Sequence, residues 1–278
     1  MYDESKKPLN KLTIKHQKKH IVLKTENLSI GYQTKKYQKV IASEIDLSIK
    51  KGSFVAILGK NGIGKSTLLR TLSKVQNSLK GAIEINQKNI SDYTHQKLAT
   101  SLSMVLTERL PESQLTVFEL VALGRQPYTN WIDTLSEKDI SKINWALEHT
   151  EIAHLKNNRF YELSDGQLQR VLIARALAQD TEIIILDEPT AHLDIHHTIK
   201  IFSLLKKLVA TTQKTILIST HEVNLAIQLA DELILLSEEK TLSGTSEELI
   251  NQNAFEELFP KEMISFNKSL KQFVIQKK

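Results

Sequence analysis

Cysteine is absent from this chain of 278 residues, and glycine and proline are scarce, at 9 and 5 residues. Without cysteine the protein has no disulfide, no thiolate zinc site and no cysteine nucleophile, so a reducing compartment is permitted. No apolar run approaches the roughly 20 residues that a membrane-spanning helix needs. Residues 1–20 are rich in lysine and lack the apolar segment of a signal peptide. We therefore expect a cytosolic protein that does not itself cross a bilayer.

The charge balance is basic, with a net charge of +5 at pH 7. Clustered lysine and arginine favour binding to nucleic acids or anionic lipids. No aromatic residues interleave with the lysines, although such interleaving is typical of surfaces on which bases stack. We interpret residues 1–20 as a loose basic arm and the remaining charge as solvated surface, and we expect no nucleic-acid partner.

Hydrophobic patterning after the arm is typical of an α/β protein. Residues 44–50 alternate apolar and polar side chains, as in a half-buried strand, and residues 54–58 are apolar throughout, as in a sheet covered on both faces. Further strands are predicted at 21–30, 183–186, 215–219 and 233–236. The last three alternate with helical segments, which favours a parallel sheet.

A helical insert is predicted to interrupt this α/β pattern at about 91–165. Residues 91–158 change to helical character, and Ser136 and Asp139 have the spacing of a capping box ahead of apolar residues at helical spacing. The chain shows no repeat of fixed period and no low-complexity tract.

Residues 59–67, with the sequence Gly-Lys-Asn-Gly-Ile-Gly-Lys-Ser-Thr, match the phosphate-binding loop pattern G-x-x-x-x-G-K-[ST]. A predicted strand precedes them, and an amphipathic helix is predicted to follow, with Leu68, Leu69, Leu72 and Val75 on its apolar face. Glycines let several backbone N–H groups face one anion, and the helix N-terminus adds the positive end of its dipole. An ordinary glycine turn is the alternative, but the strand and helix context argues against it.

This loop predicts a site for a nucleoside triphosphate and Mg²⁺. Lys65 would reach the β- and γ-phosphates, and the hydroxyl of Ser66 would be a ligand of Mg²⁺. The loop residues predicted to bind the nucleotide are Gly59, Asn61, Gly62, Gly64, Lys65, Ser66 and Thr67.

Two carboxylates end the apolar strand predicted at 183–186. Asp187 would position Mg²⁺, and Glu188 would act as general base on the attacking water. An acidic pair at a strand end is often no more than a cap, but the upstream phosphate loop favours a catalytic pair. His221 directly follows the strand predicted at 215–219, so parallel order would bring it to the same sheet edge, although a lone histidine is often structural.

A second anion-binding element is predicted at 163–167, Leu-Ser-Asp-Gly-Gln, ahead of a helix at 168–177. Ser164 and Gly166 at a helix start offer a hydroxyl and backbone donors, although a capped buried helix would also explain them. The order of the motifs, from phosphate loop through 163–167 and the Asp187-Glu188 strand to His221, resembles that of ABC ATPases. In that family the signature motif normally reads L-S-G-G-Q.

The resemblance covers about 21–260 and implies a P-loop NTPase core with an N-terminal antiparallel β-subdomain and a helical subdomain insert, followed by a C-terminal tail at 261–278. It implies that ATP binds between the phosphate loop of one copy and Ser164, Gly166 and Gln167 of the other, in a homodimer. Asp194 would lie in the loop that joins the two sites, and His221 would be the switch histidine. Tyr32 would stack on adenine, although it also suits an ordinary strand aromatic.

The chain departs from the family pattern at two places. Asp165 replaces a glycine of the signature motif, and Thr107 stands where the family has a glutamine that links Mg²⁺ to the helical insert. Glu108 or Gln114 are the other candidates for that link. His196 and His197 match no motif and are predicted to be solvated.

Residues 115–128 resemble the insert of ATPases that energise import of iron-siderophores, haem and cobalamin, although a simple amphipathic helix is the alternative. The resemblance implies integral membrane permease subunits, an extracytoplasmic substrate-binding protein acting indirectly, and a peripheral location on the cytoplasmic face of the membrane. Import or export of another small cargo is the alternative, and a nucleic-acid-associated or uncoupled ATPase is less favoured because the chain has one ATPase unit and no long heptads. Residues 107–128 are predicted to form the groove for a permease helix.

Overall fold

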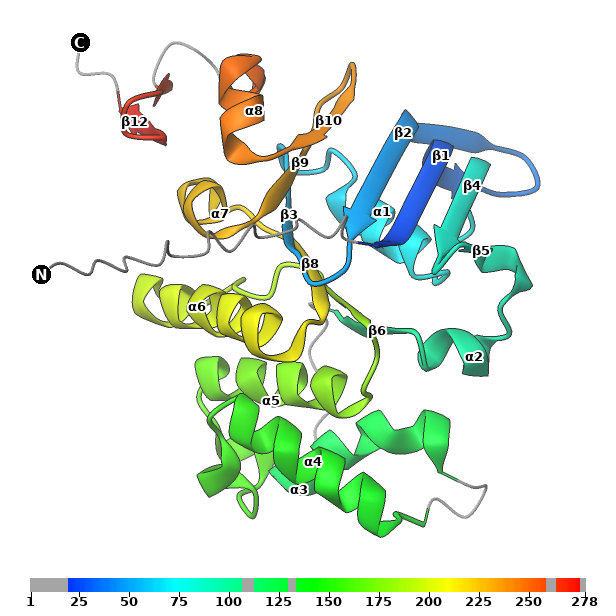
Figure 1. The fold of residues 1–278 in the computed structure, drawn as a ribbon, viewed down its shortest axis with the longest axis vertical. Helices are drawn as coiled ribbons and strands as arrows, with labels where there is room; N and C mark the ends of the chain where they lie inside the picture. The colour runs from blue at the N-terminus through cyan, green and yellow to red at the C-terminus, as the bar shows by residue number, and fades with distance from the viewer. Residues whose placement is uncertain (1–19, 107–112, 130–133, 259–263, 276–278) are drawn as a thin grey trace, which may run out of the picture.

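The computed structural model describes residues 20–106, 113–129, 134–258 and 264–275. At its centre lies a six-stranded sheet with the order β10-β9-β3-β8-β7-β6 (Figure 1). Its strands are β3 (Phe54–Leu58), β6 (Leu102–Val105), β7 (Ile183–Leu186), β8 (Thr215–Ser219), β9 (Glu232–Leu236) and β10 (Thr241–Gly244). The strands from β9 to β6 run parallel, and β10 pairs antiparallel with β9 at one edge. The predicted mixed, mainly parallel sheet is confirmed.

The central strands are buried on both faces, as their continuous apolar sequences predict. Along β3, Phe54, Ala56 and Leu58 belong to one hydrophobic cluster, whereas Val55 and Ile57 belong to another. Side chains alternate across a strand, so one apolar run supplies both cores.

An antiparallel sheet and helix α1 (Lys65–Leu72) cover one face, and the predicted β-subdomain is confirmed. The sheet has the order β2-β1-β4-β5, with bounds Gln38–Lys50, Ile21–Gln33, Lys80–Ile85 and Lys88–Asn89. Helix α1 packs Leu68, Leu69 and Leu72 into this core. Val75 does not continue the helix as predicted: Lys74 has a left-handed φ of 60°, and Val75 is 63% exposed.

Helices cover the other face, and α3, α4 and α5 pack against one another below the sheet in Figure 1. The α-helices are α2 (His95–Ala99), α3 (Val117–Ala122), α4 (Glu137–His149), α5 (Asp165–Ala178), α6 (Ile195–Thr212), α7 (Val223–Leu229) and α8 (Ser246–Asn251). Short 3₁₀ helices span Ile90–Asp92, Leu123–Tyr128, Ala153–Leu155, Phe160–Glu162 and Ala254–Glu257. The predicted capping box of Ser136 and Asp139 begins α4.

Within the predicted insert of about 91–165, strand β6 belongs to the main sheet. Each residue of β6 pairs in parallel with β7, from Leu102 with Ile183 to Val105 with Leu186. The helices α3, α4 and α5, which pack against one another, follow β6 in the chain.

The predicted tail at 261–278 contains a hairpin of β11 (Ile264–Asn267) and β12 (Gln272–Ile275). Phe266 and Phe273 pack on Phe255, and the Asn224 amide on α7 accepts a hydrogen bond from the backbone N–H of Phe273 at 2.8 Å. These contacts hold the hairpin to the core. In the described part of the chain, no helix is both long and apolar enough to cross a membrane.

Candidate nucleotide site

The phosphate-binding loop connects the end of β3 to the start of α1. Gly62 and Gly64 have φ of 76° and 114°, in the left-handed region that favours glycine. At Gly59, an added Cβ would lie 2.7 Å from the carbonyl oxygen of Leu236. These positions therefore require glycine for the shape of the loop itself.

Lys65 is buried within this loop. Its ammonium donates hydrogen bonds to the carbonyl oxygens of Gly59 at 3.0 Å and Lys60 at 3.3 Å. Burial lowers the pKa of Lys65, while the nearby charges of Glu188 and Asp187 act to raise it. The ammonium of Lys65 is thus bound to the loop backbone and feels the charges of both carboxylates.

Asp187 and Ser66 meet at the end of β7. The hydroxyl of Ser66 donates to Asp187 Oδ1 at 2.8 Å, and the buried hydroxyl of Ser219 donates to the same oxygen at 2.6 Å. A carboxylate and a hydroxyl side by side are the hard oxygen ligands that suit Mg²⁺, which commonly uses one or two carboxylates together with phosphate oxygens. Ser66 and Asp187 offer this pair of oxygen ligands and would need phosphate oxygens to complete a Mg²⁺ site. Among the described residues, no group of three His, Cys, Asp or Glu side chains is suited to a metal.

Glu188 and His221 form the second pair at this sheet edge. His221 Nε2 lies 2.8 Å from Glu188 Oε1, and both side chains are partly exposed. The backbone N–H of Glu188 donates to the hydroxyl of Ser219 at 2.8 Å, and Glu188 has a left-handed φ of 46°. Non-glycine residues in this region are commonly held there at functional sites. The predicted meeting of Glu188 and His221 is present in the fold.

Ser219 was not singled out in the sequence. The parallel register pairs Leu186 with Ile218, so the next residues, Asp187 and Ser219, lie side by side. Ser219 is a polar residue at the end of an otherwise apolar strand, next to a strand that ends in carboxylates. That pattern could have indicated its place in the site.

Tyr32 lies near the end of β1, 52% exposed, with its hydroxyl 3.1 Å from the Thr67 hydroxyl. The contact joins the antiparallel sheet to the first turn of α1. An exposed ring fixed to the phosphate-binding element is suited to the predicted adenine contact.

The signature residues begin α5. The Ser164 hydroxyl accepts from the Gln167 backbone, and the Gln167 side chain accepts from the Ser164 backbone, which forms a capping box. Asp165 is exposed. Figure 1 shows α5 among the helices at the lower end of the view and α1 near the antiparallel sheet at the upper end. The contacts described for these residues are with one another and with His197.

His197 was predicted to be solvated, and its side chain is 42% exposed, but it also makes specific contacts. Its Nδ1 lies 2.9 Å and 3.0 Å from the two carboxylate oxygens of Asp194, and its ring contacts Gly166. These hydrogen bonds, with that from the His197 backbone, lower the pKa of Asp194. His196 is exposed, as predicted, with its ring 5.7 Å from that of His197.

Of the three candidates for the link to the helical part, the structure describes one. Thr107 and Glu108 lie outside the described residues, and Gln114 is exposed, with its backbone oxygen accepting a hydrogen bond from Arg159. The carbonyl of Val105 accepts from the backbone N–H of Asp187 at 2.9 Å. The chain therefore leaves β6 directly beside the predicted Mg²⁺ site.

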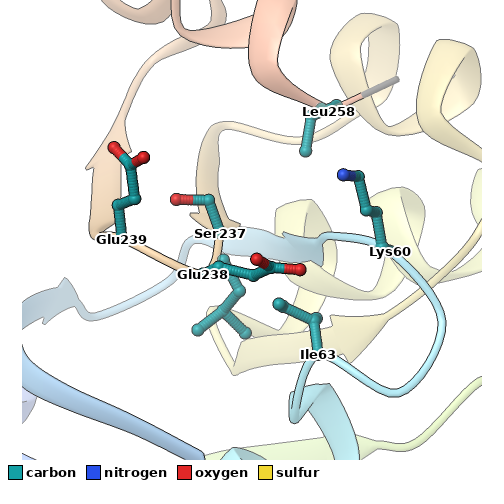
Figure 2. A pocket seen from close by; sticks show the side chains of 7 residues that line it. Lys60, Ile63, Ser237, Glu238, Glu239 and Leu258 are labelled. Atoms are coloured by element: carbon teal, nitrogen blue, oxygen red, sulfur yellow. The ribbon is translucent and has the colours of Figure 1, made fainter. Parts of the chain in front are cut away.

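The phosphate loop also borders a pocket of about 260 Å³ (Figure 2). Its lining consists of Lys60, Ile63, Leu236, Ser237, Glu238, Glu239 and Leu258. None of these is a predicted nucleotide ligand, so the pocket is separate from the site described above.

Comparison with known proteins agrees with the fold and the motifs. The family model for ABC transporters matches residues 42–191. The chain is 37% identical to the iron(3+)-hydroxamate import ATP-binding protein FhuC of Bacillus subtilis, covering 85% of this chain and 87% of that protein. It is 35% identical to the ferric enterobactin transport ATP-binding protein FepC of Escherichia coli, covering 85% and 86%.

A dimeric structure of the ATP-binding cassette MJ0796, bound to ADP and phosphate, matches with a TM-score of 0.67 and 30% identity, covering 79% of this chain and 97% of that one. The protein therefore belongs to the ABC transporter family of ATP-binding proteins. It is the nucleotide-binding ATPase subunit of such a transporter, as the motifs indicated.

Proposed function

We propose that this chain energises the import of an iron-siderophore or a closely related metal chelate. The observation that carries the proposal is its similarity to siderophore-import ATPases over more than four-fifths of both chains. The segment 115–128, which resembles the insert of such importers, supports it. The subunit would work as a homodimer bound to permease subunits, peripheral to the cytoplasmic face of the membrane, with a substrate-binding protein delivering cargo on the other side.

The chemistry of this ATPase follows from the side chains at the end of β7. Ser66 and Asp187 would hold Mg²⁺, which when bound would neutralise charge on the phosphates of ATP. Glu188 would accept a proton from the attacking water, and His221 would orient the Glu188 carboxylate through the 2.8 Å contact. Lys65 would reach the β- and γ-phosphates, and Tyr32 would contact adenine. Ser164, Gly166 and Gln167 of the second copy would complete the site.

Uptake in cells lacking this gene tests the proposed cargo. Labelled ferric siderophore, haem and cobalamin are supplied separately, and the defect is complemented with wild type, Lys65→Ala or the exposed control Lys97→Ala. We expect siderophore uptake to be lost, and to be restored by wild type and Lys97→Ala but not by Lys65→Ala. Normal siderophore uptake with a defect for another cargo would overturn the siderophore proposal and leave the ATPase assignment intact.

A further inference from the structure

Helices α5 and α6 meet at a contact between a glycine and a histidine. Gly166 is the second residue of α5, and an added Cβ there would lie 2.6 Å from Cδ2 and 3.1 Å from Cγ of His197. His197 is in the first turn of α6. The imidazole ring therefore occupies the space where any larger residue at 166 would place its side chain.

The backbone at position 166 does not itself require glycine. Gly166 lies within a regular helix and has no positive φ, and alanine is favoured over glycine in helices. Within one chain, the steric demand for glycine at 166 comes from the His197 ring. This differs from Gly62 and Gly64, whose backbone angles require glycine.

The same ring is fixed on its other side by Asp194. Nδ1 of His197 donates to the carboxylate, and Asp194 Oδ1 also accepts the backbone N–H of His197 at 2.8 Å as the N-cap of α6. A chain of contacts thus runs from the first turn of α5 through the ring to the loop before α6. Asp194 and Gly166 are both predicted nucleotide-site residues, and His197 joins them within one chain.

We propose that His197 is a positioning residue for ATP hydrolysis, whose ring sets the Asp194 loop against the signature turn at Gly166. It acts through Asp194 and Gly166 and does not touch the substrate. The proposal rests on the proposed roles of those two residues and is independent of the transported cargo.

Two single variants distinguish the contribution of the hydrogen bond to Asp194 from that of the His197 ring. His197→Ala removes both, and His197→Asn keeps an N–H at the position of Nδ1. We expect His197→Ala to lower kcat about three- to tenfold, the range for loss of one hydrogen bond, and Asn to recover most of it. Affinity for a fluorescent ATP analogue should stay within about twofold of wild type, because the phosphate loop is untouched. His196→Ala, the matched neighbour, should leave kcat unchanged.

A sharper test combines Gly166→Ala, which creates a steric clash with the His197 ring, with His197→Ala, which removes that ring. In the full-length purified chain, Gly166→Ala should lower kcat by about tenfold or more, since ring and methyl group cannot share the space. Adding His197→Ala should return kcat to that of His197→Ala alone, whereas adding His197→Asn should not, because the Asn oxygen occupies the place of Cδ2.

The proposal would be overturned if the double variant kept the low kcat of Gly166→Ala while its analogue binding and thermal midpoint stayed near wild type. Position 166 would then require glycine for another reason, such as close approach of the partner's nucleotide. Loss of analogue binding in wild type itself would instead contradict the nucleotide site, so the two failures are distinguishable.

Discussion

Ser219 joins the two carboxylates at the end of β7, donating to Asp187 and accepting from the backbone of Glu188. We expect Ser219→Ala to lower kcat about tenfold with little change in KM for ATP, because it loosens Glu188 and Asp187 without removing a phosphate contact. Unfolding by urea should show a loss of about 1–3 kcal/mol from the buried N–H left unpaired. A rise in KM with kcat unchanged would place Ser219 in nucleotide binding instead.

Asp165 stands where the family signature has glycine, and its substitution tests whether this difference affects ATP-driven dimerisation. If its carboxylate faces the partner's triphosphate, repulsion weakens the ATP-driven dimer, and salt screens that repulsion. We expect Asp165→Gly to tighten ATP-driven dimerisation and to make it less salt-dependent, as measured by analytical ultracentrifugation at several salt concentrations. An unchanged dimerisation constant across salt would show that Asp165 points away and only stabilises the N-terminus of α5.

Single residues were predictable where a local pattern carries the chemistry. The phosphate loop, Asp187 and Glu188 follow directly from short motifs beside apolar strands. Ser219 and His197 were missed because their roles depend on contacts between segments 31 or 32 residues apart, from Gly166 to His197 and from Asp187 to Ser219. Sequence spacing alone does not bring such segments together.

At the scale of elements, a buried ion pair ties the helical part together. Arg125 Nε donates to Asp139 Oδ1 at 2.8 Å, and its NH1 donates to the carbonyl of Ala178 at the end of α5, at 2.7 Å. Arg125 and Asp139 are 2% and 5% exposed. Arg125, within the segment resembling importer ATPases, therefore holds α4 and α5 around the 3₁₀ helix Leu123–Tyr128.

We expect Asp139→Asn to lower the free energy of unfolding by about 3 kcal/mol, because it leaves Arg125 buried without its counter-charge. Urea unfolding measures this. Glu247→Gln, which breaks the exposed pair with Lys271, is the matched control and should cause no resolvable change. Equal effects of the two variants would contradict a structural role for the buried pair.

The same pair predicts a pH dependence of stability. Burial acts to raise the pKa of Asp139, but hydrogen bonds from Ser136 and the contact with Arg125 outweigh it, so the pKa lies below its ordinary value. A lowered folded-state pKa stabilises the fold above the unfolded value of about 4, and this contribution is lost as pH falls through the folded-state pKa. The difference in stability between wild type and Asp139→Asn should therefore narrow below about pH 4. A difference in the free energy of unfolding that stays constant down to about pH 2 would show that the ionisation of Asp139 does not stabilise the fold.

Strands made of a continuous apolar run were predicted closely, whereas the short strands β6, β11 and β12 were not predicted. β3, β7 and β8 have the predicted bounds, since each is an apolar run of strand length. β6 has four residues, Leu-Ser-Met-Val, and β11 and β12 also have four each, too few for a period to stand out. Their strand form depends on pairing with β7 and with each other.

In the proposed assembly, two copies of the chain and the membrane partner would share one nucleotide-dependent motion. The chain leaves β6 beside Asp187, and the next described helices are α3 and the 3₁₀ helix Leu123–Tyr128. Phe118 of α3 and Leu123 of the 3₁₀ helix are partly buried against the core. Such a segment could transmit ATP-dependent closure to a permease helix, provided that its contacts differ between nucleotide states.

We expect Ala substitution of at least one of Thr107, Glu108 and Gln114 to lower transport-stimulated ATPase much more than basal ATPase. Cysteines introduced near Phe118 should crosslink to the permease in the assembled transporter. Glu84→Ala, in the antiparallel sheet on β4, is the control and should affect neither activity. Equal loss of both activities for every substitution, without a crosslink, would place the coupling surface elsewhere.

Glu188 at the end of β7 is proposed as the base of an ATPase that binds phosphate through Lys65. The most direct measurement compares purified Glu188→Gln and Lys65→Ala for ATP-analogue affinity, ATPase rate and ATP-dependent dimerisation. Gln keeps the shape and removes the proton acceptor, so Glu188→Gln should bind ATP normally, lose at least about 100-fold in rate and accumulate as a dimer. Lys65→Ala should lose binding itself. An ATPase rate near wild type in Glu188→Gln would show that Glu188 is not the base.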